Sequence, residues 1–363
     1  MVGTAVPRLP ATYRVARDAF CDAARATGAR LASVTHPARG PEGEPLAVDV
    51  ARLGRPDAPA RLVVISGTHG VEGHAGSMCQ HALLGDGDLL AAIGGDVGLV
   101  LVHALNPYGF AWCRRVNEDN VDLNRNCVDF TAGVPENPAY DELADALVPA
   151  RWDDPAVRAA ADEVLVAYAA RHGFGALQAA VSRGQYRHPT GVFYGGAGPV
   201  WSQRVLARIA EGELARAERV AVLDLHTGLG AWGEAELIAS HPDPAARARL
   251  ADWYGAFTVP AEGTSVSADV SGDILDGLDR WLPPGMEVTS VAIEWGTVDI
   301  VQVSNALRAD AWLHAYGDLD SPAAEAIKAE LRVAFAPAEA EWAGVVADRF
   351  RQVVSQALSG LVR

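Results

Sequence analysis

Four runs of aliphatic and β-branched residues constrain the fold of this chain most. They are Arg61–Ser66, Val97–His103, Glu218–Leu225 and Glu287–Trp295. Runs that are apolar almost throughout, rather than at every second position, are typical of strands covered on both faces. Stretches with apolar residues at helical spacing separate these runs, and the alternation predicts an α/β fold.

Helical patterns continue to the end of the chain. We expect helices over Thr12–Arg30, His74–Leu84 and Asp243–Tyr254, a long helical C-terminus over Pro322–Leu358, and a short extra strand over Glu236–Ser240. A length of 363 residues allows either two average domains or one large α/β domain. The order of the motifs described below favours one domain.

The segment 129–198 differs in composition from the rest of the chain. Proline-rich loops lead into the alanine-rich helical stretch Pro155–His172, and a stretch rich in glycine and tyrosine, Gly184–Gly198, follows. We therefore expect an insertion or lid at 129–198 within a single catalytic domain that spans residues 1–363.

Charge and composition exclude several classes of protein. The formal net charge of -16 repels a polyanion, and the chain contains no stripe rich in lysine and arginine, so nucleic acid is not an expected partner. The first ten residues lack the basic and apolar regions of a signal peptide. No window approaches the roughly 18 apolar residues that a membrane helix requires. A cytoplasmic location is expected.

His69 and Glu72 lie where the first predicted strand meets the following helix. Ligands of open α/β sheets gather at this edge. The glycines at positions 67, 70 and 73 let the backbone fold tightly, so that an imidazole and a carboxylate three residues apart can reach one cation. Taken alone, the spacing is a weak signal in a chain with ten histidines.

His226 lies at the end of another apolar strand, within the sequence Asp224–Gly228. It would supply a third ligand to the same cation. Two imidazoles and one carboxylate leave the fourth position of a tetrahedral zinc ion open to water, as a catalytic zinc site requires. A hydrogen-bonded histidine at a strand end is the alternative for His226 alone.

Glu294 ends a third apolar strand and precedes Trp295. Apolar surroundings raise the pKa of a carboxyl group, whereas a nearby cation lowers it. A carboxyl group whose pKa is set by these two opposing effects suits a general base that takes a proton from water and returns it to a leaving amine. A glutamate in an ordinary salt bridge is the alternative.

The stretch Arg114–Asn126 is the most distinctive in the chain, because dense polar residues directly follow a buried strand. Guanidinium groups and an asparagine amide can grip a carboxylate, and a second guanidinium can polarise a carbonyl group. The alternative is a solvated loop with local turns.

The order of four motifs along the chain resembles that of the zinc carboxypeptidase superfamily. The motifs are His-x-x-Glu, Asp-Leu-Asn-Arg-Asn, Asp-x-His-Thr-Gly and a strand-end glutamate. The same superfamily contains succinylglutamate desuccinylases and aspartoacylases. The sequences of these motifs are most similar to those of a bacterial branch whose members mostly lack an assigned substrate. The matching positions span residues 66 to 297. The resemblance implies a three-layer α/β/α fold with a mixed, largely parallel central sheet.

The resemblance also implies roles for individual residues. His69, Glu72 and His226 would bind one zinc ion per chain, and Glu294 would be the general base and acid. Asp122 matches the carboxylate that orients the first zinc histidine.

The polar stretch supplies the remaining matches. Asn124 and Arg125 match the pair that binds the free carboxylate of a peptide or N-acyl amino acid, and Arg115 matches the arginine that steadies the oxyanion. The neighbouring Arg114 leaves the choice between the two arginines open.

One departure concerns the tyrosine that classical carboxypeptidases place over the substrate. The stretch between Arg125 and His226 is longer than in those enzymes, and no tyrosine aligns with theirs. Tyr194 is a candidate, although a packing role is favoured for it.

These matches predict a zinc-dependent hydrolase that cleaves an amide next to a free carboxylate, foremost a carboxypeptidase. The sequence does not separate this activity from a deacylase of N-acyl amino acids or other small amides. A homologue that binds metal or ligand without catalysis is a further alternative, against which Glu294 and the arginines argue. The segment Gly67–Gly73 lacks the Gly-x-Gly-x-x-Gly spacing, and the chain contains no Gly-x-x-x-x-Gly-Lys phosphate-binding loop and no Gly-x-Ser-x-Gly elbow.

Overall fold

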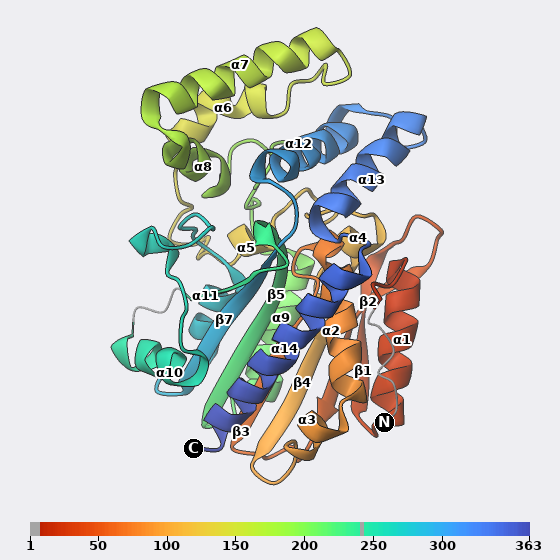
Figure 1. Ribbon diagram of the computed structural model, residues 1–363, viewed down its shortest axis with the longest axis vertical. Coiled ribbons are helices and arrows are strands. Elements are labelled where there is room, and N and C mark those ends of the chain that lie inside the picture. Colours follow the sequence, from red (N-terminus) through yellow and green to blue (C-terminus); the bar gives the residue numbers. More distant parts are fainter. Residues whose placement is uncertain (1–7, 240–242) are drawn as a thin grey trace.

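The computed structural model describes residues 8–239 and 243–363, and this part of the chain contains one seven-stranded mixed sheet in the order β1-β2-β4-β3-β5-β7-β6 (Figure 1). The four central strands β4, β3, β5 and β7 are parallel, and β1, β2 and β6 run antiparallel to their neighbours or to each other. The strands are β1 Arg30–Arg39, β2 Pro45–Leu53, β3 Ala60–Ile65, β4 Val97–His103, β5 Arg219–Trp232, β6 Ala235–Ile238 and β7 Glu287–Gly296.

Helices cover both faces of the sheet, so the architecture is three-layer α/β/α. The helices are α1 Tyr13–Ala26, α2 Gly73–Gly85, α3 Gly87–Ala91, α4 Pro107–Ala111, α5 Leu123–Asn126, α6 Pro138–Leu147, α7 Pro155–His172, α8 Phe174–Ser182, α9 Trp201–Ile209, α10 Pro244–Tyr254, α11 Ile274–Trp281, α12 Ile300–Tyr316, α13 Pro322–Phe335 and α14 Ala340–Leu361, with the short turns η1 Gly70–Glu72, η2 Ala210–Leu214 and η3 Pro260–Glu262. Among the described residues, no helix is both long and apolar enough to span a membrane.

Side chains that alternate along β3 explain the two covered faces. Leu62 and Val64 pack in a core cluster with α1, α2, α10 and α14. Val63 and Ile65 point to the opposite face and pack in a second cluster with α9 and α11. Because both faces are buried, the strand is apolar at every position except Arg61.

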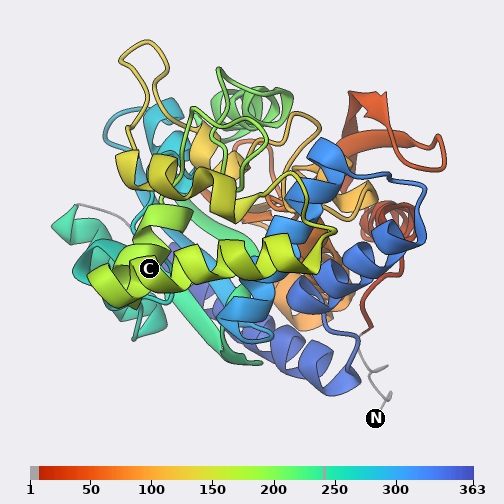
Figure 2. The same cartoon turned by 90° about the horizontal axis from the view of Figure 1, so that it is seen from above.

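A third core cluster joins α6, α7, α8, α12 and α13. These helices lie over the carboxyl ends of the parallel strands, and α7 crosses above the sheet when the molecule is seen from above (Figures 1 and 2). Helices α6 to α8 belong to the segment 129–198. The fold therefore places this segment over the edge at which β3, β5 and β7 end.

The strands of the parallel core lie where the sequence predicts them, whereas the β1–β2 hairpin does not follow from it. Most side chains of β1 are exposed or only partly buried, so its sequence lacks a continuous apolar run. Edge strands of this kind give a weak sequence signal. The predicted strand Glu236–Ser240 corresponds to β6, and its last residue, Ser240, lies outside the described residues.

The helical C-terminus expected over Pro322–Leu358 is present and is divided into two helices. The chain forms two helices, α13 and α14, and Ala336 between them has φ -147° and ψ 68°. Pro337 follows Ala336 in the sequence and accounts for the break. A proline has no N–H to donate, and it disfavours helical geometry in the residue before it.

Candidate metal centre

His69, Glu72 and His226 converge on one point at the carboxyl edge of the sheet. One ligand atom from each side chain lies within 4.8 Å of the others, and all three side chains are buried. The Nδ1 atom of His69 lies 3.0 Å from Oε1 of Glu72, and Nδ1 of His226 lies 3.0 Å from Oε2 of the same carboxylate. The two Nδ1 atoms are 3.2 Å apart.

The chain brings these residues together through two adjacent parallel strands. His69 and Glu72 follow β3, and His226 lies in β5, which pairs with β3. The connection also requires Gly70, because a Cβ atom there would lie 2.0 Å from the carbonyl carbon of Gly109. The glycines of the motif therefore permit the tight turn that the sequence indicated.

Each imidazole contacts a buried carboxylate through its other nitrogen. Nε2 of His69 lies 3.1 Å from Oδ1 of Asp122, and Nε2 of His226 forms a hydrogen bond with Asp224. The hydroxyl of Thr68 also donates to Asp224, at 2.7 Å. These carboxylates hold both rings with Nδ1 facing Glu72, an arrangement that is common around metal-bound histidines.

Asp224 was missed by the sequence interpretation, although a signal was available. Residues two apart in a strand point to the same face, so Asp224 and His226 share one side of β5. A buried aspartate two residues before a proposed ligand could have been recognised as its partner.

The charges at the centre shift several pKa values. Burial alone would raise the pKa of Glu72, but His69 and His226 outweigh it and hold this pKa below its usual value. Burial likewise opposes the charged forms of Asp122 and His226. The guanidinium of Arg115 nevertheless lowers the pKa of Asp122, and Asp224 raises the pKa of His226.

The donor set fits a divalent cation. Two imidazole nitrogens and one carboxylate are a donor set of catalytic zinc sites. Three buried carboxylates, those of Glu72, Asp122 and Asp224, favour positive charge at this point. In the described part of the chain, His69, Glu72 and His226 are the one group of three potential ligands that meets in this way.

Glu294 lies on β7 directly opposite His226 on β5. Its Oε1 accepts a hydrogen bond of 2.9 Å from the backbone N–H of Leu229, and the side chain lines the cavity beside the candidate metal centre. Burial, and then the negative charge of Glu72, raise the pKa of Glu294 to about 8.

Arg114 and Arg115 point in different directions. Arg115 lines the cavity, with Nη1 3.0 Å from Glu72 and Nε 3.0 Å from Asp122. Arg114 instead donates to Asp310 at 3.0 Å and to Asn120 at 2.9 Å. Of the two, Arg115 is the arginine beside the candidate metal centre.

Asn124 and Arg125 also line the cavity. The amide nitrogen of Asn124 lies 3.4 Å from Nε2 of His226, and its oxygen accepts from the backbone N–H of Ile274. Arg125 donates to the backbone carbonyls of Ser182 and Asn124. Only three of the five N–H groups of a guanidinium take part in these bonds, so the others can bind a ligand.

Phe193, rather than Tyr194, lines the cavity. The guanidinium carbons of Arg115 and Arg125 each lie 5.4 Å from the centroid of the Phe193 ring. Phe193 has φ 55°, which is rare for a residue with a side chain. Tyr194 is buried in a core cluster, in agreement with the favoured packing role. No sequence pattern singles out Phe193.

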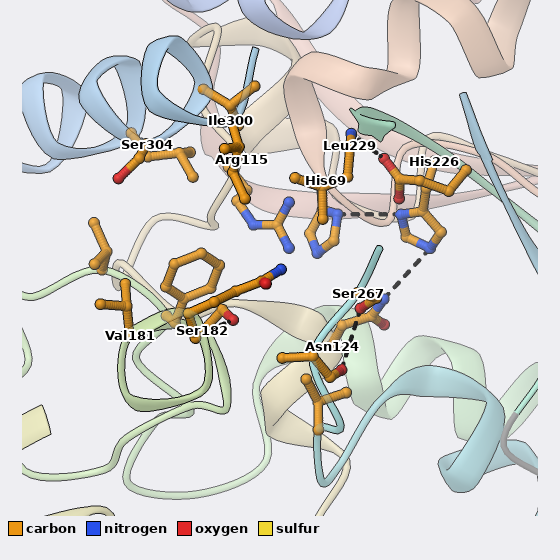
Figure 3. Close-up of a pocket in the computed structure, with 18 of the residues that line it drawn as sticks. His69, Arg115, Asn124, Val181, Ser182, His226, Leu229, Ser267, Ile300 and Ser304 are labelled. Atoms are coloured by element: carbon orange, nitrogen blue, oxygen red, sulfur yellow. Dashed lines mark hydrogen bonds between the residues drawn. The ribbon is translucent and has the colours of Figure 1, made fainter. Parts of the chain in front are cut away.

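The candidate centre opens into a cavity of about 480 Å³. Figure 3 shows His69 and His226 facing one another, with Arg115 beside His69. The cavity is lined by residues of the sheet edge and by residues of α7, α8 and α12. His69, His226, Glu294, Arg115 and Arg125 therefore line one cavity.

A family model with the description "Protein of unknown function (DUF2817)" matches residues 10–349. No curated protein matches the chain significantly.

Similar solved structures are distant in sequence. They include the carboxypeptidase A from Helicoverpa armigera (TM-score 0.48, 12% identity, 91% of this chain and 75% of that chain) and a metallo-carboxypeptidase from Burkholderia cenocepacia (0.42, 15%, 95% and 68%). A succinylglutamate desuccinylase/aspartoacylase from Rhodobacter sphaeroides also matches (0.38, 15%, 81% and 66%).

Proposed function

The chain belongs to the DUF2817 family, and we propose that it is a zinc-dependent hydrolase that cleaves an amide bond next to a free carboxylate, foremost as a carboxypeptidase. One observation carries the proposal. The ligand atoms of His69, Glu72 and His226 meet within 4.8 Å of one another, and Glu294 stands beside them on the neighbouring strand.

His69, Glu72 and His226 would hold the zinc ion, with Asp122 and Asp224 orienting the two imidazoles. When bound, the ion would supply Lewis-acid chemistry, polarising the amide carbonyl and making water more acidic.

Glu294 would act as the general base and acid. It takes a proton from the attacking water and delivers it to the nitrogen of the leaving amine, so that the amide bond breaks. The raised pKa of Glu294, about 8, favours its protonated form and hence the form that gives the proton to the amine. A cation held by His69, Glu72 and His226 would favour the ionised form that takes the proton from water.

Arg115 would stabilise the negative charge that develops on the carbonyl oxygen. Asn124 and Arg125 would bind the free carboxylate next to the scissile bond, through the amide of Asn124 and the remaining N–H groups of Arg125. Fixing this end of the substrate would hold the amide at the reacting groups.

A deacylase of N-acyl amino acids would use the same residues. The apolar side chains of α7, α8 and α12 that line the cavity, such as Leu165, Leu177 and Ile300, favour it as a second candidate. Free peptides, peptides with a blocked C-terminus and N-acyl amino acids distinguish the two activities. A carboxypeptidase releases terminal residues from free peptides alone, whereas a deacylase releases amino acids from the N-acyl series.

Elemental analysis combined with activity tests the proposal. The wild-type protein is expected to contain about one zinc per chain, and Glu294→Gln should keep the metal while losing hydrolysis. His226→Ala should lose both. A protein that binds no zinc, or a Glu294→Gln variant as active as the wild type, would contradict the proposal.

A further inference from the structure

The cavity has a polar end and an apolar wall. The polar end holds the candidate metal centre, Glu294 and the arginines. The wall comes from three helices that cover the edge of the sheet, with side chains Leu165 and Val166 of α7, Phe174 and Leu177 of α8, and Ile300 and Val301 of α12. No part of the proposed amide chemistry requires these side chains.

Several residues of this wall expose much of their apolar surface. Val166, Phe174 and Val301 are 68%, 55% and 58% exposed, although each also lines the cavity. Apolar side chains that gather at the mouth of a cavity are typical of a binding surface, because water contact there is unfavourable until a ligand covers them.

The wall is held in position by a buried arginine. Arg308 on α12 donates to the carbonyls of Ala146 and Leu147 at the end of α6 and pairs with Asp162 on α7 at 2.8 Å. These bonds tie the helices on both sides of the cavity together. The wall is therefore preformed and does not need a ligand to assemble it.

Of the two proposed carboxylate-binding groups, Asn124 contacts His226 and the start of α11, away from the wall, whereas Arg125 donates to Ser182 at the end of α8. In Figure 3, Ile300 of the wall lies beside Arg115, and Asn124 lies near His226, to which a dashed line joins it. A substrate whose carboxylate is bound by Asn124 would place its amide at the candidate metal centre. Its acyl part would then extend toward the wall.

We infer that this wall binds a large apolar acyl group and that the substrate class is an N-acyl amino acid with a long aliphatic chain. The inference rests on the proposed amide hydrolysis, in the form of the deacylase activity named above as the second candidate. Hydrolysis adds one water molecule to the amide and yields an aliphatic carboxylic acid and a free amino acid. The wall shields the aliphatic chain from water, and this burial strengthens binding with each added methylene.

Calorimetric titration of zinc-loaded Glu294→Gln with N-acetyl-, N-octanoyl- and N-dodecanoyl-leucine tests the inference. The affinity should rise by about threefold to fourfold for each methylene that the wall covers. Equal affinities for the acetyl and dodecanoyl compounds would overturn the inference. Tighter binding of leucyl-leucine than of N-dodecanoyl-leucine would also overturn it.

A pair of surface valines provides a matched control. Val166→Asn on the wall should weaken binding of N-dodecanoyl-leucine by about fivefold and leave N-acetyl-leucine unaffected. Val333 on α13 is similarly exposed, at 55%, but lies outside the cavity lining, so Val333→Asn should change neither affinity. Equal behaviour of the two variants would contradict the assignment of the wall.

Hydrolysis by the wild-type protein separates this inference from the proposed function. If all N-acyl amino acids were hydrolysed at the same rate and bound with the same affinity, the inference alone would be wrong. If no amide were hydrolysed, while binding still increased with chain length, the proposed reaction would be wrong and the apolar binding site would stand.

Discussion

Arg114 and Arg115 are neighbours in the sequence, but their side chains have different surroundings. Arg114 is buried and paired with Asp310, which also contacts Lys328. Arg115 faces the cavity and contacts Glu72 and Asp122. The arginine at position 114 thus pairs within the fold, whereas the arginine at position 115 faces the cavity.

Exchanging each arginine for alanine should therefore have different effects. Arg115→Ala is expected to lower turnover by about 100-fold to 1,000-fold, since an oxyanion donor contributes about 3 kcal/mol in the transition state. Arg114→Ala should mainly lower the free energy of unfolding, by about 3 kcal/mol, because it leaves Asp310 with less compensation.

Steady-state kinetics and urea unfolding of both variants check this prediction, with zinc content as a control for an intact centre. Normal turnover of Arg115→Ala would contradict its assigned role. Loss of turnover without loss of stability in Arg114→Ala would show that the two roles are reversed.

His103 on β4 provides a pH-dependent contribution to stability away from the candidate site. Its ring stacks on Phe20, and burial lowers its pKa to about 4. The unfolded chain binds a proton at this residue below about pH 6.5, whereas the folded protein does not. The free energy of unfolding should therefore fall as the pH decreases from about 6.5 to about 4, by up to about 3 kcal/mol from this residue.

Urea unfolding of the wild type and of His103→Gln at pH 7.5 and pH 5.0 measures this contribution. The variant lacks the titrating imidazole, so its stability should fall less between the two pH values. Equal losses in both proteins would exclude a role for His103.

At the scale of elements, Arg308 links α12 to α6 and α7. Replacing it by methionine removes donors from the carbonyls of Ala146 and Leu147 and should cost about 2 to 4 kcal/mol. Hydrogen exchange should become faster in α6 and α7, whereas β3 and β5 should remain protected.

The matched control for this element is Asp162→Asn. Asp162 is 51% exposed, so its loss should cost about 1 kcal/mol or less. A uniform increase in exchange across the whole sheet in the Arg308 variant would contradict a local role for this arginine.

At the scale of the whole molecule, the proposed metal ligands come from distant parts of the chain, so metal binding should stabilise the fold as a unit. Free zinc at about 100 times its Kd would add about 3 kcal/mol to the free energy of unfolding. A chelator should accordingly lower the Tm of the wild type. The Tm of His226→Ala should respond little, and an equal response of both proteins would contradict the assigned centre.

The sequence predicted the parallel core and the residues at its edge because both follow from local patterns. Apolar runs define β3, β4, β5 and β7, and polar motifs at strand ends must gather at one edge. The β1–β2 hairpin and Phe193 could not be predicted in this way. Their positions depend on pairing and packing between residues far apart in the chain.

The contact of Phe193 with two arginines has a thermodynamic consequence. Since both guanidinium groups lie over one aromatic ring, an anion that draws either arginine away from the ring alters the energy of the other contact. Such coupling is reciprocal. Binding of an anion at one arginine would then change the affinity of the other arginine for its own partner by the same factor in both directions.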